Sequence, residues 1–274
     1  MKGSSPLLGI LTGVLVVALI IVSYYGAFVP GIYAYENTSF AVQGIGQDVF
    51  DLLIVVPVLL ISLTLKISGS KTGYFVFGGS VLYTLYSFFI YSFGVHFNQL
   101  FLLYCIILGA SLYTFILLIF ESGQLNLKEA LHPQAPVKTI GVYFISIALL
   151  FYALWLKDII PALLTDSTPK DIVDNQLITN PVHVMDIAIM LPGLIFVAIL
   201  LIRKHPIGIL LTPFCLVFTI LLAMALLSMV IMLNIKGINE DLSVAGIFVG
   251  LSVISLVLLF LFLKNFQIPK KILK

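Results

Sequence analysis

The chain has 274 residues, of which 61% are hydrophobic and only 9% are charged, and its mean hydropathy is +1.19. A soluble domain is about 25% charged and at most about half apolar, so this composition excludes a soluble globular protein and predicts a surface covered mostly by lipid. The formal net charge is +2, and no run of Lys and Arg is longer than two residues. Nothing in the sequence therefore points to nucleic acid as a partner.

Eight apolar runs are long enough to cross a bilayer as helices, which takes about 20 residues. The first run follows Lys2 and is too long for the core of a secretory signal, so we expect it to remain as a membrane helix. We expect Pro213 to bend or tilt the longest run. The sequence thus predicts an all-α transmembrane bundle with helices at about 7–28, 50–67, 73–95, 98–120, 139–157, 184–202, 206–235 and 243–264.

The basic residues predict the orientation of the bundle, because cytoplasmic segments are enriched in Lys and Arg. With the N-terminus inside, all 14 basic residues except Lys157, Lys170 and Lys236 fall on the inner side. Of the 12 acidic residues, only Glu121 and Glu129 do so. We therefore expect a multi-pass protein of the cell (plasma) membrane, in contact with the lipid bilayer, with both termini in the cytoplasm.

Two segments, 47–57 and 182–192, resemble each other at an offset of 135 residues. In each segment, a proline stands six residues after an acid, and a second polar residue stands three residues before that acid. Four helices return the chain to the same side, so we predict two parallel halves of one membrane domain, 1–130 and 131–274. In the alternative interpretation, each acid only caps a helix. The matched positions are Asp48, Asp51 and Pro57, and His183, Asp186 and Pro192. Upstream, Pro30 and Pro161 are expected to end the preceding helices.

Polar residues gather at the predicted outer ends of several helices. Asp51 stands 15 residues before Lys66, which is about 22 Å of helix and places it near the edge of the hydrocarbon. A carboxylate at that depth needs a partner or a wet cavity. We therefore expect a site for a small solute or ion at this face. Its candidate residues are Asp48, Asp51, His96, Asn98, His183 and Asp186.

The third predicted helix carries a stripe of polar residues that runs outward towards His96. The stripe residues are a candidate lining for a polar pathway, and packing between helices through hydrogen bonds is the alternative interpretation. They are Ser80, Tyr83, Thr84, Ser87 and Tyr91.

Histidine and carboxylate side chains together suit divalent metals, and two histidines can ligate haem. A divalent metal or haem is therefore a candidate cofactor, with His96, His183 and Asp186 as metal ligands. In the alternative interpretation, both histidines lie half in water at the membrane interface.

Two stretches carry a resemblance to known sequences: residues 91–104, YSFGVHFNQLFLLY, and residues 179–186, TNPVHVMD, which lead to Pro192. They resemble a group of prokaryotic polytopic membrane proteins without an established activity. The resemblance implies a membrane protein and no mechanism.

Three functional hypotheses follow from these patterns. Transport or binding of a small solute or ion comes first, because of the half-length repeat and the paired acids. A metal- or haem-binding membrane protein is the second, and a membrane-embedded enzyme or accessory subunit is the third. The sequence holds no phosphate-binding glycine loop, no Gly-x-Ser-x-Gly and no His-Glu-x-x-His.

Overall fold

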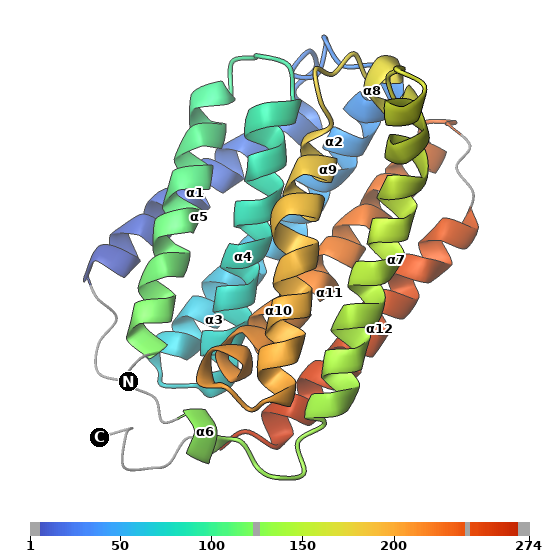
Figure 1. Ribbon diagram of the computed structural model, residues 1–274. Coiled ribbons are helices and arrows are strands. Elements are labelled where there is room, and N and C mark those ends of the chain that lie inside the picture. Colours follow the sequence, from blue (N-terminus) through green and yellow to red (C-terminus); the bar gives the residue numbers. More distant parts are fainter. Residues whose placement is uncertain (1–5, 123–126, 239–241, 268–274) are drawn as a thin grey trace.

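The computed structural model describes residues 6–122, 127–238 and 242–267, and these ranges form a helical bundle without a named strand (Figure 1). Eight helical spans in them are long and apolar enough to cross a membrane, as predicted. Only helices satisfy every backbone hydrogen bond within one segment, which lipid requires. The spans are Pro6–Phe28, Thr38–Ile67, Lys71–Gly94, Phe101–Ser122, Val137–Leu164, Pro181–Ile202, Pro206–Ile235 and Ser243–Lys264.

Two of these spans contain a wider π-helical turn, and two short helices lie between spans. The elements of the first half are α1 (Pro6–Phe28), α2 (Thr38–Phe50), η1 (Asp51–Val55), α3 (Val56–Ile67), α4 (Lys71–Gly94), α5 (Phe101–Ser122) and α6 (Leu127–Ala130). Those of the second half are α7 (Val137–Leu164), α8 (Lys170–Asp174), α9 (Pro181–Met185), η2 (Asp186–Met190), α10 (Leu191–Ile202), α11 (Pro206–Ile235) and α12 (Leu242–Lys264).

The second and sixth spans begin earlier than the apolar runs predicted, at Thr38 instead of about 50 and at Pro181 instead of 184. Their caps are asparagines: Asn37 accepts a hydrogen bond from the backbone N–H of Phe40, and Asn180 accepts one from that of Val182. The interpretation of Asp51 and Asp186 as helix caps is therefore wrong. Both acids lie inside continuous helical spans. The end that holds the two asparagines is the predicted outer end and is called the outer end below.

The two prolines upstream behave differently. Helix α1 ends at Phe28, before Pro30, as expected. The expectation for Pro161 is wrong, because α7 continues through it to Leu164. At this place near the helix end, the missing N–H of proline costs one helical hydrogen bond, and the carbonyl of Pro161 still accepts a bond from the N–H of Thr165 at 3.0 Å.

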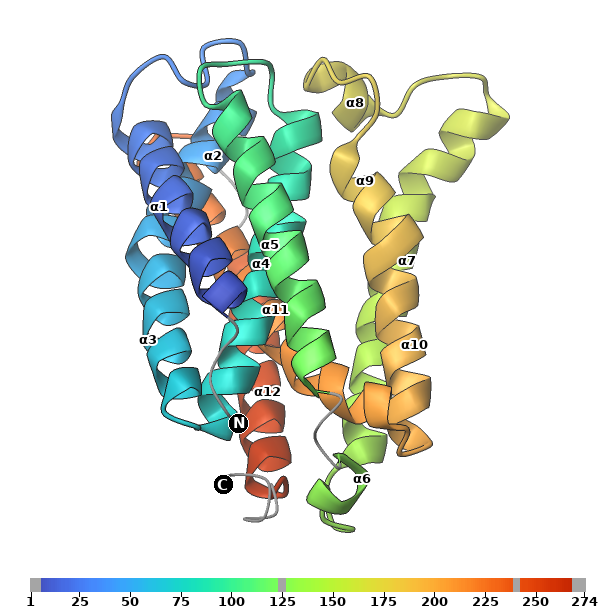
Figure 2. The same ribbon diagram turned by 90° about the vertical axis from the view of Figure 1, so that its left-hand side faces the viewer.

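The centre of the bundle is the packing of α4 against α11 (Figure 2). Helix α4 also contacts α3 and α5, while α11 also contacts α2, α10 and α12. Glycines permit the close approach of α4 to α11. A Cβ atom at Gly78 would lie 2.3 Å from the ring of Phe214, and one at Gly79 would lie 2.8 Å from the carbonyl oxygen of Phe214. Small residues serve the same purpose in many membrane helix pairs.

The two segments that resemble each other in sequence also have the same local geometry. Helix η1 begins at Asp51 and η2 at Asp186, and each π turn is closed by a backbone N–H that donates to the carbonyl of its first aspartate. The tight turns that follow α3 and α10 match as well. Gly69 and Lys204 both have positive φ, 83° and 52°. All these pairs are 135 residues apart.

Contacts between the halves repeat at the same offset. A Cβ atom at Gly46 on α2 would lie 2.8 Å from the Cα of Met229 on α11. A Cβ atom at Gly94 on α4 would lie 2.5 Å from the side chain of Pro181 on α9. Position 46 corresponds to 181 and position 94 to 229, so the two contacts are reciprocal, as a two-fold axis along the bundle would make them. The duplication itself stays a prediction.

Opposite to the outer end, an ion pair joins α3 to α5. The Nζ of Lys66 lies 2.9 Å from Oε2 of Glu121, and the Lys66 side chain is only 2% exposed. Pairing is the expected state of an ionic side chain buried within a membrane bundle. The contact brings together two residues that the charge distribution predicted to lie on one side.

The α4–α11 contact predicts the effect of enlarging Gly79. We expect Gly79→Leu to force the helices apart and to cost about 1–3 kcal/mol of stability, as overpacked cores do. Gly109→Leu on α5 is the matched control, because a Cβ atom there meets no atom within 4 Å. The measurement is thermal unfolding in detergent. Equal melting temperatures for both variants would contradict the close packing.

Candidate functional site

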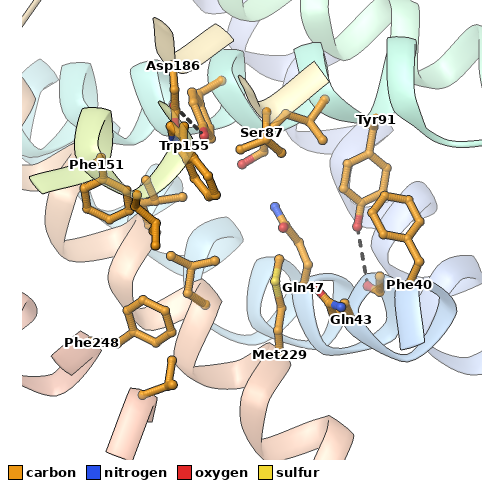
Figure 3. Close-up of a pocket in the computed structure, with 18 of the residues that line it drawn as sticks. Phe40, Gln43, Gln47, Ser87, Tyr91, Phe151, Trp155, Asp186, Met229 and Phe248 are labelled. Carbon is orange, nitrogen blue, oxygen red and sulfur yellow. Dashed lines mark hydrogen bonds between the residues drawn. The ribbon is translucent and has the colours of Figure 1, made fainter. Parts of the chain in front are cut away.

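A cavity of about 460 Å³ lies between the two halves of the bundle (Figure 3). Cavities that bind small molecules commonly have 300–1,000 Å³ and a mostly apolar lining with a few placed polar groups. This lining fits that description. Its walls come from α2 and α4 of the first half and from α7, α9, η2, α11 and α12 of the second half. Its polar side chains are those of Tyr33, Gln43, Gln47, Tyr86, Ser87, Tyr91, Trp155 and Asp186.

Asp186 is the acid that lines the cavity, and it is 7% exposed. The hydroxyl of Tyr86 donates to its Oδ1 at 2.9 Å, and the indole N–H of Trp155 donates to its Oδ2 at 2.9 Å. Tyr86 belongs to α4, so this bond joins the two halves. A carboxylate has about four acceptor sites, which leaves Asp186 able to accept further hydrogen bonds from a ligand.

His183 packs against Trp155, one of the two donors to Asp186. Its ring centroid lies 4.6 Å from that of Trp155, and its Nε2 lies 3.8 Å from Oδ2 of Asp171. Asp171 also accepts a hydrogen bond from the side chain of Asn180 at 2.7 Å. His183 is 8% exposed, so the interpretation of this residue as half in water is wrong.

The second acidic group is formed by Asp48 and Asp51, both 0% exposed. Asp48 accepts hydrogen bonds from the hydroxyls of Tyr33 and Tyr91, the second at 3.2 Å. Burial, as the larger cause, and the charge of the neighbouring Asp48 raise the pKa of Tyr33 well above its usual value. Tyr33 is therefore a neutral hydroxyl that donates to the carboxylate.

Asp51 has fewer partners than Asp48. The hydroxyl of Tyr83 donates to its Oδ1 at 2.7 Å, and Tyr83 in turn accepts from Nε2 of Gln47 at 3.2 Å. Among the described residues, Oδ2 of Asp51 has no hydrogen-bond partner. A buried polar atom without a partner is costly, and in a native structure it calls for an explanation, such as strain, a catalytic role, or a bound water or ion.

Hydrogen bonds connect the cavity to both buried acids. Gln47 lines the cavity and leads through Tyr83 to Asp51, while Tyr33 and Tyr91 line it and donate to Asp48. Figure 3 shows Gln47 reaching into the cavity from α2, with Trp155 and Asp186 facing it from the second half. The cavity thus lies between one acidic group in each half.

The two π turns place Asp51 and Asp186. Pro57 and Pro192 have no N–H to continue the α-helical pattern, and the turns before them are widened to i→i+5 bonding. Such π bulges often occur at functional sites.

His96 and Asn98 lie apart from the cavity lining. The Nδ1 of His96 lies 2.9 Å from Oε2 of Glu36, and its backbone N–H donates to Oε1 of Glu36 at 2.7 Å. Asn98 donates from its side chain to the hydroxyl of Tyr104 at 3.2 Å. The His96 contacts anchor the loop between α4 and α5 to the loop after α1, and the Asn98 contact joins the same loop to α5.

The predicted stripe on α4 divides into two parts. Ser87 and Tyr91 line the cavity, and Tyr83 binds Asp51. Ser80 and Thr84 lie deeper and donate to carbonyls of their own helix, at 2.8 and 2.9 Å. The hydrogen-bonding capacity of these two hydroxyls as donors is therefore used within α4.

The predicted metal ligands have separate partners: His96 with Glu36, His183 with Asp171, and Asp186 with Tyr86 and Trp155. In the described part of the chain, no group of three or more His, Cys, Asp or Glu side chains could hold a metal ion. Metal or haem binding stays a prediction without a ligand set here.

Five polar side chains of the cavity are absent from the candidate residues predicted from sequence: Tyr33, Gln43, Gln47, Tyr86 and Trp155. Trp155 is typical of the aromatic belt at a membrane interface, and nothing in the sequence around it predicts its contact with Asp186. Tyr86 stands next to Ser87 but outside the polar stripe. The sole signal was for Gln47, which precedes Asp48 directly.

Comparison with known proteins does not identify a family for this chain. No family model, no curated protein and no solved structure matches the chain.

Tyr83 is predicted to stabilise the buried Asp51. We expect Tyr83→Phe to lower the free energy of unfolding by about 1–3 kcal/mol, because the carboxylate then loses its hydroxyl donor. Tyr113→Phe on α5 is the control, since Tyr113 is 60% exposed. Thermal unfolding in detergent measures the difference. A Tyr83→Phe variant as stable as the control would contradict the hydrogen bond.

Proposed function

We propose that the protein binds a small solute in the cavity between its halves and moves it across the membrane. Asp186 contacts the solute, and the Asp48–Asp51 pair takes up a proton or a cation. The observation that carries this proposal is the position of one cavity between two buried acidic groups, one in each half.

The cost of burial supports a transport role for these acids. Carboxylates at membrane depth are rare, and they commonly mark ion pathways and proton relays. Asp51 combines complete burial with one oxygen that has no partner among the described residues. Binding of a proton or a cation at that oxygen removes the unfavourable state.

The connection between the acids and the cavity supports coupling. Gln47 and Tyr83 lead from the cavity wall to Asp51. A solute that forms a hydrogen bond with Gln47 alters the bond between Gln47 and Tyr83, and Tyr83 is the donor to Asp51. The charge state of Asp51 and the occupation of the cavity are therefore linked. Such reciprocity between two binding events is general.

The reciprocal packing of the halves supports the movement. Transporters often bind solute between two repeats that rock against each other. The cavity lies at such an interface, next to the contacts of Gly46 with Met229 and of Gly94 with Pro181.

The experiment uses purified protein in lipid vesicles that hold a pH-sensitive dye. Decay of an imposed proton gradient is measured with sodium, potassium, tetramethylammonium or decyltrimethylammonium outside. We expect faster decay than in empty vesicles with at least one of these cations. Asp51→Asn and Asp186→Asn, which keep the side-chain size, should slow it about tenfold or more, because neither can hold the negative charge.

Asp158→Asn is the matched control. Asp158 lies on α7 towards the outer end, and its side chain is 62% exposed. It should keep the wild-type rate, and thermal unfolding checks that all variants are folded. Decay equal to that of empty vesicles with every cation, or wild-type rates in both Asp51→Asn and Asp186→Asn, would overturn the proposal.

A further inference from the structure

The cavity has an edge at the lipid-facing surface, between α7 and α12. These helices are joined at Tyr143, whose hydroxyl lies 2.6 Å from that of Ser255 and donates to the carbonyl of Leu251. Trp155 stands 12 residues further along α7, about 18 Å from Tyr143. At that level both helices line the cavity.

The side chains along this edge line the cavity and are at the same time exposed. Leu150 is 58% exposed, Leu154 is 40% exposed and Ile247 on α12 is 56% exposed. All three lie within membrane spans, where an exposed surface meets lipid. The corresponding helices of the first half, α1 and α5, pack against each other. The second half is therefore the side on which the cavity opens towards the bilayer.

The polar end of the cavity suits a positive charge. Asp186 lines it, and the lining contains no Lys, Arg or His among the described residues. Aromatic side chains share the cavity with the acid: Tyr86 and Trp155 contact Asp186, and Phe151 and Phe248 belong to the same lining. Aromatic faces bind cations, and quaternary ammonium groups in particular. An anionic head group would instead meet a carboxylate without a counter-charge, which is unfavourable.

The depth of Asp186 suits the head of an amphiphile. It lies five residues from Pro181, where its span begins, which is about 7.5 Å along the helix. A span of 22 residues is about as long as the hydrocarbon core is thick, so the carboxylate lies near one edge of that core. A molecule at this depth reaches Asp186 by moving sideways, and its chain stays among apolar side chains.

We propose that the cavity takes an amphipathic cation, which enters from the outer leaflet between α7 and α12 and places its charged head at Asp186. This inference rests on the proposed binding of a solute in the cavity and names its class. The hydrocarbon part of the molecule lies against Leu150, Leu154 and Ile247.

Trp155 gives a direct measurement, because it is the sole tryptophan of the chain and lines the cavity. The experiment places the full-length protein in lipid vesicles and titrates it with decyltrimethylammonium that carries bromine on the chain, a contact quencher of tryptophan. We expect saturable quenching. Decanoate and decanol with the same bromination should quench without saturation, and tetramethylammonium should compete about tenfold more weakly or worse.

Variants test the role of the acid. Asp186→Asn should weaken binding of the brominated cation about tenfold or more, while Asp158→Asn should leave it unchanged. The comparison of cation, alcohol and acid in the wild-type protein needs no variant and holds even where Asp186→Asn does not fold. Equal saturable quenching by all three head groups, or unchanged binding in folded Asp186→Asn, would overturn the choice of a cation. Competition by tetramethylammonium as strong as by the decyl compound would overturn the choice of an amphiphile.

The lateral route has its own readout. Lipids brominated in their acyl chains should quench Trp155, and saturating unbrominated decyltrimethylammonium should relieve the quenching by displacing chains from the cavity. Absence of quenching, or quenching that the cation does not relieve, would overturn entry from the bilayer. Saturable binding without any cation-driven proton movement would overturn the proposed transport and leave the choice of an amphipathic cation standing. Proton movement driven only by sodium, potassium or tetramethylammonium would overturn the choice of an amphipathic cation and leave the proposed transport standing.

Discussion

The bundle depends on hydrogen bonds to acidic side chains that are buried within its membrane spans. Asp48, Asp51 and Asp186 all lie within membrane spans, and each accepts a hydrogen bond from at least one tyrosine hydroxyl. Three of the donating hydroxyls, those of Tyr83, Tyr86 and Tyr91, come from α4, so the helix that packs at the centre of the bundle also supplies hydrogen bonds to its acids. The glycines of α4 serve the same arrangement, because they let it lie close to α11 while its tyrosines point to both halves.

Local geometry repeats at an offset of 135 residues, but the chemistry does not. Asp51 and Asp186 begin equal π turns, yet Asp51 is closed off behind Tyr83, whereas Asp186 borders the cavity. Position 218, which corresponds to Tyr83, is a phenylalanine and donates no hydrogen bond. Asp186 therefore takes its donors from elsewhere, Tyr86 and Trp155. The same backbone thus supports an enclosed acid in one half and an accessible acid in the other.

Hydropathy and charge predicted the number and order of the spans, because lipid acts on every residue of a span at once. They failed at the start of the second span. Residues 38–47 include Thr, Ser, Gln and Gly, which reduce hydropathy although the segment packs between α1 and α11. The acids of the site were also found from sequence, since charge in an apolar run stands out. Their donors Tyr86 and Trp155 were not, because partners 100 and 31 residues away are chosen by packing, which no local pattern records.

The hydrogen bond from Tyr86 to Asp186 is a clasp between the two halves. One end is on α4 and the other on η2, and the acceptor is the same carboxylate that faces the cavity. In the proposed function, a cation at Asp186 competes with the Tyr86 hydroxyl for Oδ1 and so weakens one of the bonds that join the halves. Occupation of the cavity is then coupled to the contact between α4 and η2.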